Sequence, residues 1–186
     1  NSFEILMNQL GIPAEMRRAP ALAQTDIERV VVHKISKVWE FHFVFSNILP
    51  IEIFLELKKG LSEEFSKTGN KAVFEIKALS QEFSNQLLQA YYREAFSEGP
   101  CASQGFKSLY QNLQVRAEGN QLFIEGSEAI DKEHFKKNHL PNLAKQLEKF
   151  GFPTFNCQVE KNDVLTQEQE EAFHAEKDRK STRLNS

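Results

Sequence analysis

Histidines are the first side chains to consider for chemistry, because imidazole can bind a metal ion or carry a proton near neutral pH. The chain has five of them, and none has a second ligand at a spacing typical of a metal site. His134 and His139 do not match the HExxH spacing of zinc proteases. For His33 and His42, which fall in an expected hairpin, we favour a structural or surface role. His174 lies in a polar segment near the end of the chain.

The two cysteines, Cys101 and Cys157, are the candidates for a nucleophile. They form no CxxC motif and have no histidine beside them, so neither a disulfide framework nor a zinc site is indicated. A nucleophile–base pair could form only through the fold. The chain also lacks a GxxxxGKS/T or GxGxxG phosphate loop and a DxD-like acidic cluster for two metal ions. The sequence therefore assigns no catalytic, cofactor-binding or metal-binding residue.

Composition indicates a globular protein. At 186 residues the chain has room for one ordinary domain or two small ones. Hydrophobic residues make up 40% and charged residues 26%, which is typical of folded domains. No apolar run is long enough for a membrane span, and no signal segment opens the chain. We therefore expect a cytoplasmic protein with reduced cysteines and no membrane partner.

The last segments of the chain differ from the rest. Residues 178–186 resemble the translation of a common sequencing adapter, and we expect them to be an artefactual tail that is not part of the fold. They carry three basic residues and one acid, so without them the net charge changes from −3 to −5. Residues 161–177 are polar and acidic, and we expect a solvated helix or linker there. We also expect the natural chain to continue beyond Lys177.

The first part of the chain, residues 1–79, predicts the element order α-β-β-α-β. Helical spacing of apolar residues, strict alternation in strands, and glycine or proline at the ends indicate each element. The expected elements are a helix at 3–10, strands at 27–32 and 39–45 joined by a turn at 34–37, a helix from Pro50 to Phe65 closed by Gly69, and a strand at 73–76.

The second expected strand places four aromatic side chains on one face: Trp39, Phe41, Phe43 and Phe45. Alternating aromatics can stack on bases, as they do in RNA-binding sheets. This sheet, however, has only one apolar face and needs it to pack against the helix at 54–65. We therefore favour core packing over a stacking platform.

Residues 80–160 predict a second subdomain with the order α-β-β-α-α-β. Ser80 is the expected N-cap of its first helix, which runs to Gly99-Pro100 and bridges the two halves. Gly119-Asn120 is a strong signal for a two-residue hairpin. The other expected elements are a helix at 106–110, strands at 113–115 and 122–124, helices at 131–137 and from Pro141 to Phe150, and a strand at 155–159.

The order of this second half is that of a type II KH domain. A KH domain clamps nucleic acid with a GxxG loop between two helices, but the corresponding stretch, residues 137–142, has no glycine. We therefore expect an α+β fold of two small mixed subdomains, the second KH-like without its nucleic-acid loop.

Several stretches resemble one known family. They are Val30-Val31-Val32-His33-Lys34, Trp39-Glu40-Phe41-His42-Phe43, Leu49-Pro50 with Ile53-Phe54, and the opening helix with Phe3, Leu6, Gln9, Leu10, Gly11 and Ile12. Gly119-Asn120-Gln121-Leu122 and Phe150-Gly151-Phe152 agree with the same family. The likeness, over about residues 3–176, is to the N-terminal region of PolC-type DNA polymerase III α subunits, the replicative polymerases of low-GC Gram-positive bacteria.

This resemblance implies a non-catalytic fragment of a larger enzyme. In the family, two small N-terminal domains precede an OB-fold, a PHP domain with an inserted 3′–5′ exonuclease, and the polymerase palm, thumb and fingers, which use divalent metal ions and contact DNA. The N-terminal region is thought to resemble the polymerase-binding domain of the clamp-loader τ subunit. The implied role is a protein-interaction module that tethers the polymerase to replisome proteins such as τ.

Two alternatives remain open from the sequence. The first is a KH-like nucleic-acid-binding domain that contacts template DNA. The basic pairs of the chain, at 17–18, 58–59 and 136–137, are scattered among acids and do not form a stripe. The second is a small free-standing enzyme that uses Cys101 or Cys157.

Overall fold

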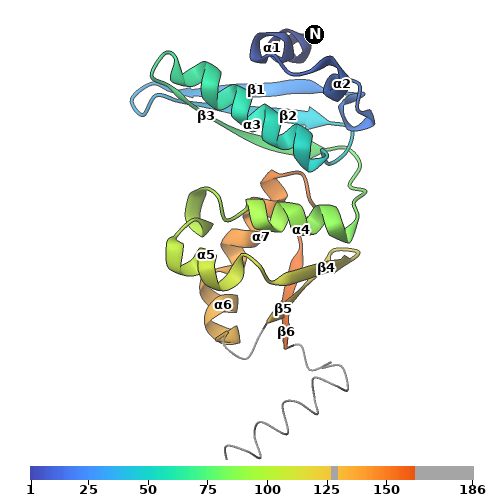
Figure 1. Cartoon of the computed structure of the whole chain (residues 1–186), viewed down its shortest axis with the longest axis vertical. Helices are drawn as coiled ribbons and strands as arrows, with labels where there is room; N and C mark the ends of the chain where they lie inside the picture. Colours follow the sequence, from blue (N-terminus) through green and yellow to red (C-terminus); the bar gives the residue numbers. More distant parts are fainter. Residues whose placement is uncertain (127–129, 162–186) are drawn as a thin grey trace, which may run out of the picture.

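The protein folds into two three-stranded sheets, each packed against helices (Figure 1). The structure, a computed structural model, describes residues 1–126 and 130–161. The α+β class with two small mixed sheets agrees with the expectation from sequence. None of the helices in these two described stretches is long and apolar enough to cross a lipid bilayer.

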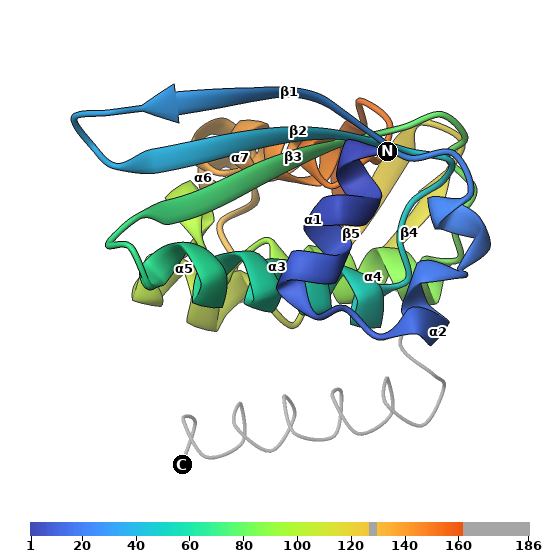
Figure 2. The same ribbon diagram turned by 90° about the horizontal axis from the view of Figure 1, so that it is seen from above.

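The first half consists of one sheet with its helices on the same side (Figure 2). Strand β2 lies in the centre, antiparallel to β1 and parallel to β3, so α3 forms the crossover between the parallel strands. The elements are α1 (Ser2–Leu10), α2 (Ala14–Arg17), the 3-10 helix η1 (Pro20–Leu22), β1 (Asp26–His33), β2 (Val38–Phe45), α3 (Ile51–Ser66) and β3 (Lys71–Ala78).

The aromatic face of β2 is core, as predicted. Phe41, Phe43 and Phe45 are buried, and Trp39 is half-buried at the end of the row. Phe3 of α1 contacts Phe43 and Phe45, with ring centroids 5.7 and 5.3 Å apart. At the other end of the sheet, α3 covers the rings of Trp39 and Phe41 through Phe65. Because two helices cover this face, nucleic-acid bases cannot stack on it.

The second half repeats the strand arrangement of the first. Strand β5 is central, antiparallel to β4 and parallel to β6, and the hairpin turns at Gly119-Asn120 as predicted. Two helices, α6 and α7, form this crossover instead of one. The elements are α4 (Asn85–Glu94), the 3-10 helix η2 (Gly99–Cys101), α5 (Gln104–Tyr110), β4 (Gln114–Glu118), β5 (Gln121–Gly126), α6 (Lys132–Asn138), α7 (Leu140–Lys149) and β6 (Asn156–Lys161).

Two details of the expected second half were wrong. Ser84, not Ser80, caps α4, because its side chain accepts a hydrogen bond from the backbone N–H of Leu87. Ser80 instead continues the sheet edge, where its N–H donates to the carbonyl of Ser46. The helix ends at Glu94, before the predicted Gly99-Pro100. Lys161, the first residue of the expected linker at 161–177, is the last residue of β6. The rest of that linker, with His174, and the tail at 178–186 lie outside the described residues.

The two halves are joined through a cluster of three rings. Phe54 of α3, Tyr91 of α4 and Phe150 after α7 lie 5.1–5.2 Å apart between centroids, and all three are buried. The hydroxyl of Tyr91 donates to the carbonyl of Leu49 at 2.7 Å. The helix expected to bridge the halves, α4, therefore does so.

We predict that Phe43→Ala lowers the free energy of unfolding by about 3–5 kcal/mol, because it removes a ring that is only 1% exposed and leaves a cavity. Denaturant-induced unfolding measures the change. Ile35→Ala, at a fully exposed site on the hairpin turn, is the control and should change stability by less than about 0.5 kcal/mol. Equal stability of Phe43→Ala and the wild type would show that the aromatic face is not core.

Candidate functional site

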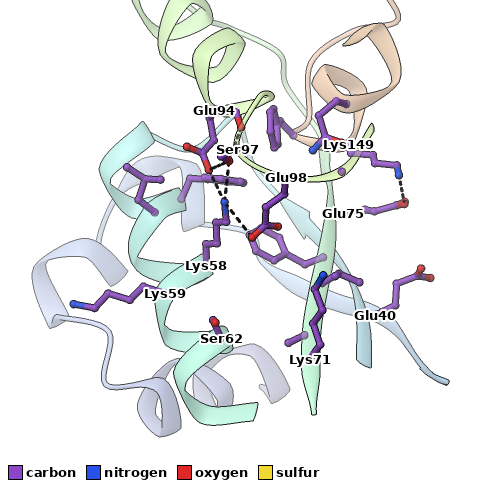
Figure 3. Close-up of a pocket in the computed structure, with 18 of the residues that line it drawn as sticks. Glu40, Lys58, Lys59, Ser62, Lys71, Glu75, Glu94, Ser97, Glu98 and Lys149 are labelled. Carbon is purple, nitrogen blue, oxygen red and sulfur yellow. Dashed lines mark hydrogen bonds and ion pairs between the residues drawn. The ribbon is translucent and has the colours of Figure 1, made fainter. Parts of the chain in front are cut away.

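A groove lies between the two halves, at the open side of β3 (Figure 3). Its volume is about 610 Å³. One wall is α3, the opposite edge is the first part of β3, and the end is closed by η2, α7 and the turn after α4. Both halves contribute to it, so neither half forms the groove by itself.

The floor of the groove is apolar. Phe54 and Phe150 are buried there, and Phe74 lies half-buried with its ring 5.3 Å from that of Phe54. Leu55 on the rim of α3 is one of the few large apolar side chains that remain exposed. Such a surface can hold an apolar side chain of a partner between polar walls.

Lys58 organises the closed end of the groove. Its ammonium group lies 2.7 Å from Oε1 of Glu94 and 3.6 Å from Oε1 of Glu98, and it donates to Oγ of Ser97 at 3.1 Å. These contacts connect α3 to the end of α4, as the dashed lines in Figure 3 show. Lys58 and Glu94 are 36 residues apart, so in the sequence Lys58 is only part of a basic pair at 58–59, with no sign of this contact.

The outer face of the first sheet carries a second polar cluster around His42. Its Nε2 lies 2.7 Å from Glu40 and its Nδ1 lies 3.6 Å from Glu75, and Glu75 also approaches Lys149 of α7 at 3.8 Å. The hydrogen bond from His42 lowers the pKa of Glu40, although burial opposes this shift. His33 is exposed, 4.0 Å from Glu40. Both histidines thus lie on the outer face of the sheet, next to carboxylates.

The joint between α6 and α7 bears on nucleic-acid binding. His139 alone separates the two helices, since it is both the C-cap of α6 and the N-cap of α7. A GxxG loop needs a longer joint to present its backbone to phosphates. The rings of His134 and His139 meet at 5.3 Å, and burial together with His134 lowers the pKa of His139. Within the described residues no three potential metal ligands form a cluster.

The outer face of the second sheet is a poor stacking platform. Phe123 is the one aromatic residue that β4, β5 and β6 place on this face. The guanidinium of Arg116 lies over its ring, 4.4 Å from the centroid. Arg116 in turn lies 3.1 Å from Glu160. Glu118 and Glu125 lie on the same face, so the charge around the ring would repel phosphate.

The cysteines are not placed as nucleophiles. Cys101 is buried and Cys157 is half-buried, and burial raises the pKa of each thiol to about 11. A reactive cysteine needs the opposite shift, which nearby positive charge or a helix N-terminus produces.

Fold and groove thus define a small two-part α+β protein with a groove between its parts. A family model described as DNA polymerase III polC-type N-terminus I matches residues 2–76, and one described as DNA polymerase III polC-type N-terminus II matches residues 90–186. The chain belongs to the PolC-type DNA polymerase III family and corresponds to its N-terminal region.

Curated relatives agree with this assignment. The chain is similar to DNA polymerase III PolC-type of Streptococcus pneumoniae serotype 2 (strain D39), with 97% identity over 176 residues. Identity is 62% over 179 residues with that of Streptococcus sanguinis (strain SK36) and 43% over 176 residues with that of Streptococcus suis (strain 98HAH33). These matches cover 95–96% of this chain but 12% of each relative. No solved structure matches.

We predict that neither cysteine reacts readily in the folded chain. With a thiol pKa of about 11, about one thiol in a thousand is ionised at pH 8. Alkylation by iodoacetamide at pH 8, followed by mass spectrometry, should therefore be much slower for Cys101 and Cys157 than in the same chain unfolded in urea. Labelling of either thiol at the rate of the unfolded chain would restore it as a candidate nucleophile.

Proposed function

We propose that this chain is a non-catalytic protein-interaction module of a PolC-type DNA polymerase III. In this proposal it tethers the polymerase to other proteins of the cytoplasmic replisome. DNA synthesis, exonuclease activity, contact with DNA and the divalent metal ions they need belong to the rest of the parent chain. The chain spans about an eighth of its relatives' length, so these properties of the whole enzyme are part of the proposal.

The observation that carries the proposal is the groove between the halves. It combines an apolar floor with charged walls, which is the composition of a protein-binding surface. Most of the charged groups around it form ion pairs such as Lys58–Glu94, and the cysteines lie elsewhere with raised pKa values. The arrangement supports recognition of a partner better than chemistry on a substrate.

The nucleic-acid alternative has less support. DNA affinity comes mainly from clustered Lys and Arg that neutralise phosphates, whereas the chain carries −3 overall and the basic pairs are dispersed. The single-residue joint at His139 leaves no room for a phosphate-binding loop. The expected partners are therefore the clamp-loader τ subunit or other holoenzyme proteins.

We predict that the full chain binds a purified replisome protein and binds DNA weakly. Surface plasmon resonance with the immobilised chain, at about 0.15 M ionic strength, should detect the clamp-loader τ subunit or another purified holoenzyme subunit. Single-stranded DNA should give no submicromolar affinity under the same conditions, because little phosphate charge is neutralised.

The matched variant for this test is Leu55→Glu, which places a charge on the rim of the groove without disturbing the core. It should weaken subunit binding, whereas Leu109→Glu, at an exposed site away from the groove, should not. Submicromolar DNA binding together with no response to any subunit would refute the tether and favour the KH-like alternative.

A further inference from the structure

Strand β3 has an open edge. In a parallel ladder, alternate residues direct both backbone groups to the same neighbouring strand. Lys71 N–H donates to the carbonyl of Lys37 and Leu79 N–H to that of Phe45, each at 2.9 Å, so the odd-numbered residues of β3 face β2. Ala72 and Phe74 therefore direct their N–H and C=O groups away from the sheet. Neither residue has a backbone partner on that side among the described residues.

The second half covers only part of this edge. Gly151, with φ at +108°, lets the chain after α7 pass beside Ile76 and Ala78, where an added Cβ would lie 3.3 Å from that of Ala78. The amide of Gln81 donates to the Gly151 carbonyl at 3.0 Å and fixes this approach. The stretch from Lys71 to Glu75 lines the groove instead. At the rise of a strand this open stretch is roughly 16 Å long.

The charged side chains of the groove that form no ion pair among the described residues are lysines. Four glutamates and four lysines line it: Glu40, Glu75, Glu94, Glu98, Lys58, Lys59, Lys71 and Lys149. Every one of these glutamates lies within 4.0 Å of a lysine or histidine of the chain. Lys59 and Lys71 are exposed and form no ion pair within the described residues. Lys71 lies at the start of β3, whereas the side chain of Lys59 points away from that strand (Figure 3).

We propose that the groove binds an extended acidic segment of a partner protein, which adds to β3 as a fourth strand. Its backbone would pair with Ala72 and Phe74, an apolar side chain would fill the gap over Phe74 and Phe54, and a carboxylate would reach Lys71. Open edges accept strands in this way, with main-chain hydrogen bonds for affinity and side-chain pockets for specificity. This mode of binding rests on the proposed tethering function and specifies its partner surface.

The test uses the full chain and fluorescein-labelled peptides. The probe peptide alternates valine and glutamate. One control peptide alternates valine and lysine, and a second control has N-methyl groups on its backbone, which remove the N–H donors. Anisotropy should show binding of the valine–glutamate peptide, at least about tenfold weaker binding of the lysine peptide, and none of the N-methylated one. Hydrogen exchange at Ala72 and Phe74 should slow when the first peptide is bound.

Charge-reversal variants separate the groove from the general charge of the chain. Lys71→Glu should weaken binding of the valine–glutamate peptide by roughly tenfold. Lys34→Glu, an equal change at an exposed site outside the groove, should leave the affinity for this peptide unchanged. Equal loss in both variants, or equal binding of the N-methylated peptide, would overturn strand addition.

Other occupants would be recognised as follows. A chain that sediments as a dimer, with Ala72 and Phe74 already protected from exchange, would assign the edge to a second copy and overturn the proposal. Displacement of the peptide by single-stranded DNA would assign the groove to nucleic acid and also overturn it. If purified subunits bind without protecting Ala72 and Phe74, tethering stands and strand addition fails. If the peptide binds as expected and no purified subunit binds, strand addition stands and tethering fails.

Discussion

The contact of Phe54, Tyr91 and Phe150 is the interaction on which the rest of the structure depends. The three rings come from α3, α4 and the end of α7, so they join the helices of both halves in one core. Burial raises the pKa of Tyr91 far above its usual range, so its hydroxyl stays protonated and donates to Leu49. Without this contact, α7 and the chain after it would not lie against β3, and the groove would lose one end.

The ion pairs around the groove set its shape more than they stabilise it. Lys58 with Glu94, and Lys149 with Glu75, are partly exposed, and such pairs contribute little because water screens them. Aromatic packing, which removes large apolar areas from water, therefore holds the halves together. The ion pairs fix the end of α4 relative to α3 and the end of α7 relative to β3, and they leave Lys71 without an ion-pair partner among the described residues.

The two halves share one strand arrangement but end in different surfaces. Each has an antiparallel hairpin followed by a helical crossover to a parallel third strand. A single helix makes the first crossover, and its apolar stripe covers the aromatic face of β2. Two short helices joined at His139 make the second, which closes the position where a phosphate-binding loop would lie. The same topology thus gives a half-open strand edge in one half and a closed helix joint in the other.

The sequence by itself determined the local elements, because alternation, helical spacing and turn residues act over a few positions. Both hairpins and the buried row from Phe41 to Phe45 could be predicted in this way, and the family was recognised from the resemblance of several stretches of sequence. The cap at Ser84 was missed because Ser80 offers the same local signal, and only the path of the chain beside Ser46 excludes it. The groove could be found only from the tertiary structure. Lys58 contacts Glu94, and Gly151 contacts Ala78, and each pair is separated by many residues in the chain. Such contacts depend on how whole helices pack, and no local pattern in one sequence records that packing.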